Sequence, residues 1–385
     1  MLRLPADRVP HVVLAPDKFK GSLSAAEVAA TVADAFAQAA AEVGREVRTT
    51  EVPVADGGEG TVEAALAAGW RPLTRVVSGP TGRVHEAVLA RRGEDALVEM
   101  AQADGLDRLP DGLAPLTAGT RGTGELVRSA LDDGARRVVL AVGGSASTDG
   151  GAGMLQALGA RLLDAAGREL PGGGGALLDL ARVDLDGLDP RLAGVGWTLA
   201  ADVDNPLLGP RGAAAVFGPQ KGADPRDVER LDAGLARLAD ALAAAGVPEA
   251  RDLPGAGAAG GLGLPALGLF GARRRPGIDV VLELAGFAGR AADADLVVTG
   301  EGSFDEQSLG GKTPVGVARA AAAAGAPVVV LSGRRALTED RWRAAGFAAA
   351  IALTDLGEPA ETCVAQARPL LHRVALDLAR DLLRP

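Results

Sequence analysis

The chain has 385 residues and a formal net charge of −10, with 48% hydrophobic residues, 3% aromatic residues and no tyrosine. This length predicts two or three domains, and a core of Ala, Leu and Val favours helices that alternate with buried parallel strands. The acidic balance argues against nucleic acid and anionic membranes as partners. The single cysteine, Cys363, excludes an intrachain disulfide and a multi-cysteine metal site.

The N-terminal segment has no long apolar stretch of the kind found in signal peptides, and no run reaches the ~18 apolar residues of a membrane-spanning helix. We therefore expect a cytoplasmic protein without a membrane partner. His11, His85 and His372 show no close spacing, so a zinc site is not expected.

Two β-loop-α units open the chain. Residues 11–15 form a buried strand, and Ser24 and Glu27 form a capping box for an alanine-rich helix that ends near residue 41. Residues 45–52 alternate as a strand, and a second helix begins near Thr61. Each strand is followed by a loop rich in glycine and charge, and in open α/β sheets ligands bind at that edge.

The middle of the chain contains short strands joined by turns, and the β-loop-α alternation of the N-terminal part returns near the end. The predicted elements are strands at 71–77, 83–91 and 96–100, a helix at 124–131, strands at 137–142 and 197–201, a hairpin start at 160–164, a long amphipathic helix at 225–245, and strands at 295–299 and 326–331. Between the last two strands, Thr313 caps a helix that begins at Pro314.

Because the same β-loop-α alternation occurs near both ends of the chain, the sequence predicts one discontinuous domain built from both ends. We predict an α/β fold in which residues 1–77 and 288–385 form a Rossmann-like or flavodoxin-like domain. Residues 78–287 are predicted to form a mixed α/β domain inserted into it.

Seven loops combine glycine with carboxylates, hydroxyls or lysine. Glycine lets a backbone approach a phosphate, carboxylates hold Mg²⁺ or accept a hydroxyl proton, and lysine neutralises developing charge. Each loop can also be a solvated turn or a glycine-rich helix entry, and the 143–151 loop is the strongest candidate. The loops are 17–22 (DKFKGS), 56–60 (DGGEG), 119–125 (GTRGTGE), 143–151 (GGSASTDGG), 202–206 (DVDNP), 220–222 (QKG) and 300–313 (GEGSFDEQSLGGKT).

Two segments come close to known nucleotide motifs without meeting their requirements. Residues 311–313 (GKT) are similar to a Walker A ending, but Glu306 stands where that motif needs glycine. Residues 255–260 fit GxGxxG, but residues 250–254 before them are no buried strand. Neither a P-loop nor a dinucleotide site is expected.

Together, the loops resemble the type-1 glycerate kinase family along nearly the whole chain from His11. The resemblance is carried by APDKFKGSLSAAEVA, PVADGGEGT, GTRGTGEL, GGSASTDGGAGMLQALGA, ADVDNPLLGPRGAAAVFGPQKGA, PGAGAAGGLG and GEGSFDEQSLGGKTPVGVA. Lys18 stands where many members have serine, so Lys20 is the better candidate of the two lysines. Asp204 occupies a variable place in the DVxNPL motif, which favours Asp202.

The resemblance implies ATP-dependent phosphorylation of D-glycerate with Mg²⁺. It also implies two dissimilar α/β domains with the active site in the cleft between them. Bacterial members favour 2-phosphoglycerate as product, but the sequence leaves the 2- and 3-hydroxyl groups open. The oligomeric state is open as well, and a homo-oligomer is compatible with the resemblance.

We predict that Asp202 accepts the proton of the attacking hydroxyl, and that Lys20 and Lys312 neutralise the moving phosphoryl group or bind the substrate carboxylate. The predicted metal ligands are Asp149, Glu301 and Asp305, and base and metal roles can be exchanged among these carboxylates. The predicted substrate- and phosphate-binding residues are Asp17, Ser22, Asp56, Gly57, Gly58, Glu59, Thr120, Gly122, Gly143, Gly144, Ser145, Asn205, Lys221, Gly260 and Gln307.

Two rival functions make different demands on the sequence. A NAD-dependent glycerate reductase needs a Rossmann fingerprint after a strand, which is missing. A non-catalytic nucleotide-binding protein is expected to have lost charged residues from the loops, and none of the motif Asp, Glu or Lys positions is apolar. Cys363 is expected to be a packing residue.

Overall fold

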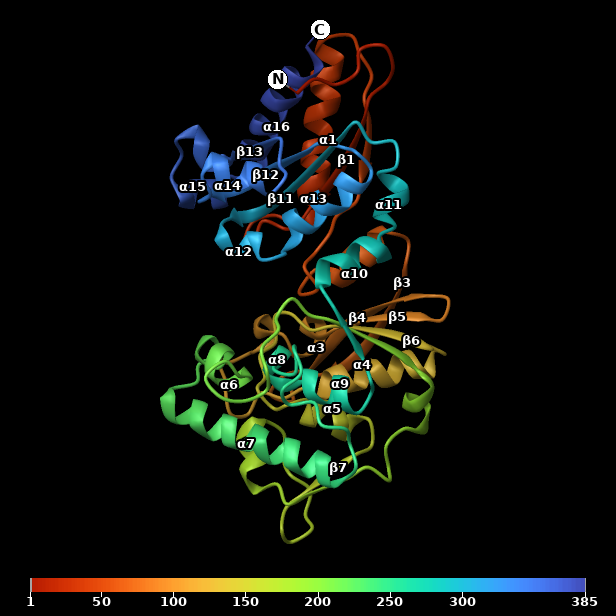
Figure 1. The fold of residues 1–385 in the computed structure, drawn as a ribbon, viewed down its shortest axis with the longest axis vertical. Helices are drawn as coiled ribbons and strands as arrows, with labels where there is room; N and C mark the ends of the chain where they lie inside the picture. The colour runs from red at the N-terminus through yellow and green to blue at the C-terminus, as the bar shows by residue number, and fades with distance from the viewer. Residues whose placement is uncertain (1, 385) are drawn as a thin grey trace. The chain divides into compact units, whose positions relative to one another are not determined.

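A computed structural model describes residues 2–384, and the chain divides into two compact units. Unit 1 comprises Met1–Asp56, Glu63–Gly69 and Gly277–Pro385, and unit 2 comprises Gly57–Val62 and Trp70–Pro276. Both chain ends belong to unit 1 (Figure 1). The predicted α/β class is confirmed, since each unit combines helices with a sheet that contains parallel strands.

The unit boundaries differ from the predicted ones at 77 and 288. The strand β3 (Arg71–Ser78) pairs antiparallel with β4 (Val84–Arg92), so it belongs to unit 2. The helix α10 (Gly277–Leu284) buries Ile278 among residues of unit 1, so the return to unit 1 comes earlier than predicted. Strand pairing sets the first boundary and helix packing sets the second, and the local pattern of predicted strands and helices shows neither of these contacts.

Unit 1 is built on a five-stranded parallel sheet in the order β13-β12-β11-β1-β2. Renumbered within the unit, this is the flavodoxin-like order 5-4-3-1-2. The strands are β1 (His11–Pro16), β2 (Arg48–Glu51), β11 (Leu296–Phe304), β12 (Val328–Arg335) and β13 (Ala349–Ala352). The second strand is shorter than the predicted 45–52.

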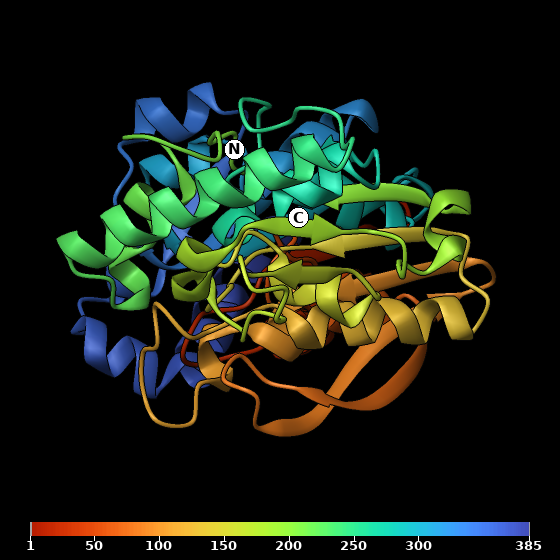
Figure 2. The same cartoon turned by 90° about the horizontal axis from the view of Figure 1, so that it is seen from below.

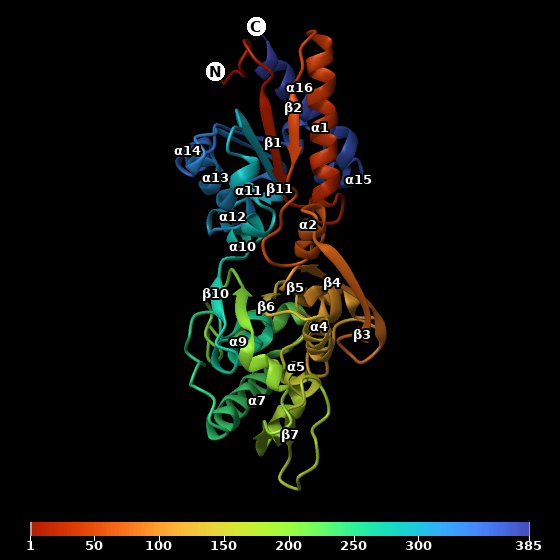
Figure 3. The same ribbon diagram turned by 90° about the vertical axis from the view of Figure 1, so that its right-hand side faces the viewer.

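Both faces of this sheet are covered by helices (Figure 3). Alternate residues of β1 show how: Val12 and Leu14 join the core with α1 and α16, whereas Val13 and Ala15 join the core with α10 and α13. The helices of unit 1 are α1 (Ala25–Glu42), α2 (Thr61–Ala67), α10, α11 (Phe287–Arg290), α12 (Glu306–Leu309), α13 (Thr313–Ala323), α14 (Glu339–Ala344), α15 (Ala360–Ala365), α16 (Ala367–Leu383) and a 3₁₀ turn at Leu353–Leu356.

The predicted capping box at the start of α1 is confirmed. The amide of Glu27 donates to Ser24 Oγ at 3.2 Å, and the Glu27 carboxylate accepts from the amide of Ser24 at 2.9 Å. The start of α13 differs by one residue, because Lys312 occupies the N-cap and Thr313 is the first helical residue.

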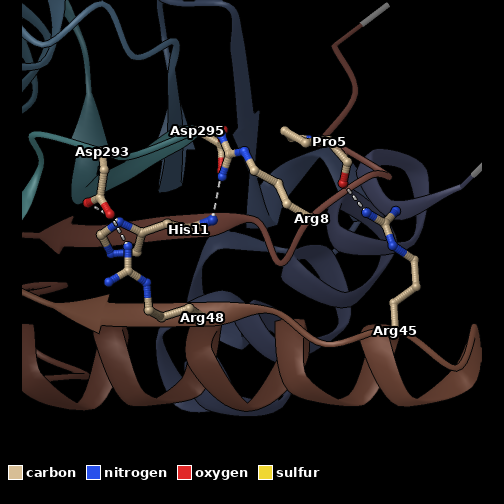
Figure 4. Close-up of polar contacts among 7 residues, drawn as sticks. All are labelled: Pro5, Arg8, His11, Arg45, Arg48, Asp293 and Asp295. Carbon is tan, nitrogen blue, oxygen red and sulfur yellow. Dashed lines mark hydrogen bonds and ion pairs between the residues drawn. The ribbon is translucent and has the colours of Figure 1, made fainter.

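At the amino ends of the strands of unit 1, polar groups tie the sheet together (Figure 4). The buried His11 contacts Asp293 through Nδ1 at 2.9 Å and Thr50 through Nε2 at 2.8 Å. Arg48 pairs with Asp293, and Arg8 pairs with Asp295. This edge lies opposite the one where the candidate loops leave the sheet, and its groups satisfy one another.

Unit 2 contains a six-stranded mixed sheet in the order β10-β9-β6-β5-β4-β3. Four of its strands are parallel, and β4 and β3 are antiparallel additions. β7 and β8 form a separate antiparallel pair, and the antiparallel bridge between Leu163 and Glu169 confirms the predicted hairpin start at 160–164. The further strands are β5 (Asp95–Glu99), β6 (Arg137–Ala141), β7 (Arg161–Leu163), β8 (Arg182–Asp184), β9 (Gly196–Ala200) and β10 (Arg273–Arg275).

Helix α5 joins two hydrophobic clusters of unit 2. Its Met154 packs in the cluster of the sheet and α4, whereas Leu155 packs with the leucine face of α7, the long green helix of Figure 2. The helices are α3 (Met100–Asp104), α4 (Arg121–Asp132), α5 (Ala152–Ala157), α6 (Ala213–Phe217), α7 (Pro225–Ala244), α8 (Ala258–Gly261), α9 (Gly263–Gly268) and 3₁₀ turns at Leu106–Arg108, Gly174–Asp179, Pro190–Gly194 and Pro219–Lys221. Within residues 2–384, no helix combines the length and apolar character needed to cross a membrane.

Candidate active site

Unit 1 has a topological switch point between β1 and β11. The chain continues from β1 to β2 on one side, while β11, β12 and β13 follow one another on the other side. At such a point, the loops leave the carboxyl ends of neighbouring strands in opposite directions, and ligands bind in the crevice between them. The sheet itself positions Asp17 here: Pro16 is paired with Gly300 of β11, and the amide of Asp17 donates to the carbonyl of Gly300 at 2.8 Å.

Asp17 lies at the base of this switch point. One carboxylate oxygen accepts from Thr313 Oγ1 and the other from the amide of Lys18, both at 2.7 Å. Burial and the nearby negative charge of Asp56 raise the pKa of Asp17 from 3.8 to about 7. Because Thr313 begins α13, the contact brings a third loop to the same point.

Glu301 is the second perturbed carboxylate of unit 1. Burial raises its pKa to about 8, and the charges of Asp17 and Asp305 act in the same direction. Its Oε1 atom is buried and has no hydrogen-bond partner among the described residues. A carboxylate oxygen left free beside a second carboxylate is a donor that suits a hard cation such as Mg²⁺.

Asp305 has a structural task. It caps α12, where it accepts from the amide of Gln307 at 3.0 Å, and it accepts from Ser303 Oγ at 2.9 Å. Within residues 2–384, no three or more His, Cys, Asp or Glu side chains group together as a metal site.

Four further predicted residues lie on the loops of unit 1. Lys20 is exposed on the loop after β1, where Ser22 Oγ donates to the carbonyl of Phe19 at 3.0 Å. Lys312 Nζ donates to Gln307 Oε1 at 3.3 Å, and the charge of Lys312 lowers the pKa of Glu301. The 300–313 segment therefore places its lysine near one of the perturbed carboxylates.

The carboxyl edge of the sheet in unit 2 carries Asp202. This residue follows β9 and is exposed. Arg274 donates to the carbonyls of Ala201 at 3.2 Å and Val203 at 3.3 Å, which fixes the backbone on both sides of Asp202. Asn205 Nδ2 donates to the carbonyl of Arg211 at 2.7 Å, so its amide stabilises the turn.

The DGGEG loop reaches the same edge of unit 2. Gly143 donates to the carbonyl of Gly57 at 3.3 Å, and a Cβ on Gly143 would lie 2.6 Å from the Cα of Gly58. Only glycine permits this approach. Asp56 is half-buried and Glu59 is exposed.

Glu99 was not predicted, yet it holds this loop in place. It is fully buried at the end of β5, and its carboxylate accepts from the amides of Val62 at 2.7 Å and Gly60 at 3.3 Å. A glutamate directly after the apolar residues 96–98 was the signal in the sequence, since a charge at the end of a buried strand needs a partner.

The predicted metal ligand Asp149 has a structural role instead. Its fully buried carboxylate accepts from the amide and hydroxyl of Thr120 at 2.9 and 2.8 Å, and from the amides of Gly151 and Gly153 at 3.2 and 3.1 Å. These donors occupy both oxygens. Asp149 therefore joins the starts of α4 and α5.

Lys221 supports the 143–151 loop from the interior. Only 2% of it is exposed, and Nζ donates to Ser145 Oγ at 2.7 Å and to the carbonyl of Ser147 at 2.5 Å. Burial lowers the pKa of Lys221 to about 7, although the charge of Asp149 opposes the shift. Lys221 thus binds the loop itself, where we had predicted phosphate.

Three other predicted phosphate-binding residues of unit 2 are also interior residues. Thr120 and Gly122 are buried, and a Cβ on Gly260 would lie 2.0 Å from the carbonyl oxygen of Ser147. Of the 143–151 loop, Gly143 and Gly144 remain accessible.

Asp104 is a second buried carboxylate that the sequence reading missed. Its Oδ2 accepts from the amide and hydroxyl of Thr123, both at 2.7 Å, and burial raises its pKa to about 8.

Comparison with known proteins assigns the chain to a family. A model described as the glycerate kinase family matches residues 12–383. The chain belongs to the glycerate kinase family. It is 45% identical over 375 residues to the glycerate kinase of Bacillus subtilis, covering 96% of this chain and 97% of the relative. It is 44% identical over 333 residues to the glycerate 2-kinase of Escherichia coli, covering 86% of each.

A solved structure agrees with this family assignment. The crystal structure of a candidate glycerate kinase 2 from Salmonella typhimurium LT2 matches this chain with a TM-score of 0.83 and 41% identity. The match covers 97% of this chain and 98% of that one, so the family resemblance extends to the fold of nearly the whole chain.

Proposed function

We propose that this protein phosphorylates D-glycerate with ATP and Mg²⁺, and that 2-phosphoglycerate is the product. The family match over residues 12–383 carries the proposal. The relative from Escherichia coli, named a glycerate 2-kinase, favours the 2-position. In unit 1, carboxylates and lysines at a switch point supply the positioning and charge neutralisation that phosphoryl transfer requires.

In the proposed reaction, the 2-hydroxyl oxygen of glycerate attacks the γ-phosphorus of ATP. A bond forms between that oxygen and the phosphorus, the bond from the γ-phosphorus to the β,γ-bridging oxygen breaks, and ADP leaves. The proton of the hydroxyl passes to a carboxylate. Lys20 and Lys312 neutralise charge on the transferred group, and Gly143 and Gly144 offer the accessible backbone of unit 2. That loops of both units serve one substrate is part of the proposal.

Glu301 and Asp17 are the residues of unit 1 that would hold Mg²⁺. The free Oε1 of Glu301 fits a hard cation, and the neighbouring Asp17 carboxylate, which accepts from Thr313 and the amide of Lys18, adds negative charge beside it. The Asp149 carboxylate is fully buried and accepts four hydrogen bonds. When bound, Mg²⁺ neutralises phosphate charge and orients the phosphates.

We keep Asp202 as the proposed base. It is exposed on a loop that Arg274 fixes, so it is accessible to a substrate hydroxyl. Asp17 is the second candidate, because its raised pKa of about 7 is close to the value at which a general base works best.

The decisive assay is release of ADP from ATP when D-glycerate is added, with a reaction lacking glycerate as control. Phosphorus NMR of the product separates 2- from 3-phosphoglycerate. Oxidation of NADH with hydroxypyruvate would instead support a reductase, and tight ATP binding without turnover would support a non-catalytic binding protein. Cytoplasmic location and a homo-oligomeric state remain predictions.

A further inference from the structure

Unit 1 contains a pocket beside the switch point that the proposed chemistry does not use. Its volume is about 250 Å³, and it is lined by the loop after β1, the carboxyl ends of β11 and β12, the turn after β13, and α15. This size is slightly below the range of about 300–1,000 Å³ that is typical of ligand sites. It suits one ring system rather than a complete nucleotide.

Glycines allow the backbone of β11, of β12 and of the loop after β1 to approach one another closely at the pocket. A Cβ on Gly333 would lie 2.6 Å from the carbonyl oxygen of Gly302, and a Cβ on Gly302 would lie 3.2 Å from the amide nitrogen of Lys20. The strands β11 and β12 stay paired up to Phe304 and Arg335, so on this side Gly302 and Gly333 offer backbone beside the side chains of Ser303 and Arg334.

The opposite wall is apolar. Phe19 and Cys363 are buried, but Val364 on α15 is 51% exposed and is one of the few large hydrophobic side chains at the surface. An apolar wall that faces a pocket is stabilised when an apolar ligand covers it.

The remaining lining is cationic or hydroxylic. Lys20 and Arg334 contribute positive charge, and Ser303 and Thr354 contribute hydroxyl groups that donate or accept hydrogen bonds. The lining residues of this pocket include no carboxylate. A flat ring with polar edges, attached to an anionic group, matches this combination, because guanidinium groups stack on aromatic rings.

We propose that this pocket binds the base and ribose of the nucleoside triphosphate, an assignment that rests on the proposed kinase function. Lys20 lines the pocket and also lies three residues after Asp17, so a base seated here directs its phosphates toward Asp17 and Glu301. Glycerate suits the pocket less well, because it is small and polar throughout and would leave the apolar wall uncovered.

The test fills the pocket with Val364→Trp and compares it with Val43→Trp. Val43 is a matched control, since it is a 42% exposed valine of unit 1 outside the pocket. We expect Val364→Trp to weaken ADP binding in calorimetry by ~10-fold or more, equal to ~1.4 kcal/mol, and to raise the KM for ATP similarly. The KM for D-glycerate and the affinity of the control for ADP should change less than ~2-fold.

A second measurement needs no variant. Photolabelling with 8-azido-ADP, followed by mapping of the labelled peptides, should mark residues that line the pocket, such as Thr354 or Val364, and D-glycerate should not prevent the labelling. Labels confined to peptides outside the pocket, or labelling that D-glycerate abolishes, would overturn the assignment.

The two proposals fail in different ways. An active glycerate kinase whose ADP affinity is unchanged by Val364→Trp keeps the function and refutes the pocket assignment. A chain that binds ADP in this pocket but releases none from ATP with glycerate refutes the function and keeps the pocket assignment.

Discussion

The carboxyl edges of the two sheets use similar loops in opposite ways. In unit 1, the loop after β1 presents Lys20 to solvent, and Asp17 at its start lies near Glu301 of β11 at a switch point. In unit 2, the 143–151 loop turns inward: Lys221 binds Ser145 Oγ and the carbonyl of Ser147, whereas the buried hydroxyls of Ser147 and Thr148 have no hydrogen-bond partner among the described residues. Glycine and charge in a loop can therefore mean either contact with a ligand or support for a backbone.

Substitution of Asp202 tests whether the exposed loop after β9 in unit 2 supplies the catalytic base. We expect Asp202→Asn to lower kcat by about 10²–10⁴-fold, because an amide cannot accept the hydroxyl proton. Thermal unfolding should be unchanged, since the side chain is exposed. Asp204→Asn, on the same loop, is the control and should retain near-normal kcat. If Asp202→Asn does the same, Asp17 becomes the base.

Substitution of Lys20 tests whether the exposed loop after β1 in unit 1 contacts the substrate. Lys20→Ala should lower kcat by about 10²–10³-fold, the usual cost of removing one group that stabilises transition-state charge. Lys18→Ala, two residues away, should lose far less. Steady-state kinetics with both variants decides between them, and equal losses would mean that the loop acts only through its net charge.

Lys221 tests the supporting role of the loop in unit 2. Lys221→Met leaves the Ser145 hydroxyl and the Ser147 carbonyl without their partner, so we expect a loss of about 1–3 kcal/mol in the free energy of unfolding. Folding lowers the pKa of Lys221 from 10.5 to about 7, so its contribution to stability rises with pH between these values.

The difference in Tm between wild type and Lys221→Met should therefore grow from pH 7 to pH 10. A constant difference across this range would show that the amine keeps its proton in the folded protein. A fall in kcat without any loss of stability would mean that Lys221 contacts the ligand and does not mainly support the loop.

Asp17 should show the smallest effect on the free energy of unfolding, and one of opposite sign. Folding raises its pKa from 3.8 to about 7, so its contribution to stability is lost as pH rises through this window. At pH 8, Asp17→Asn removes a buried negative charge and should gain on the order of 1 kcal/mol, or about 2–4 °C in Tm for a domain of about 150–250 residues. At pH 4 the gain should vanish, and a gain independent of pH would contradict the shift.

The sequence predicted those features of the fold that depend on local chemistry. The capping box of Ser24 and Glu27, the leucine face of α7 and the buried strands at 295–299 and 326–331 each follow from neighbouring residues. The unit boundaries near 77 and 288 do not follow from neighbouring residues, because β3 is assigned to unit 2 by its pairing with β4 and α10 is assigned to unit 1 by its packing.

In the candidate site, too, the sequence predicted features that depend on local motifs and missed features that depend on burial and distant partners. Motif order was enough to predict the family, and it pointed to Asp17, Lys20 and Glu301. It could not separate exposed from buried members of a motif, so Asp149 and Lys221 were assigned to ligands although both are interior residues. Glu99 and Asp104 were missed because their partners are backbone amides and a threonine far away in the sequence.

The insertion of unit 2 has a consequence for the order of folding. β1 pairs with β2 on one side and with β11 on the other, where Val12 is joined to Leu296, so ribosomes working at about 5–20 residues per second leave the β11 side of β1 unpaired for roughly 15–60 s. The strands of unit 2 all lie between residues 71 and 275 and face no such delay. A waiting hydrophobic strand is a template for wrong pairing, which makes unit 1 the late-folding part that depends most on chaperones.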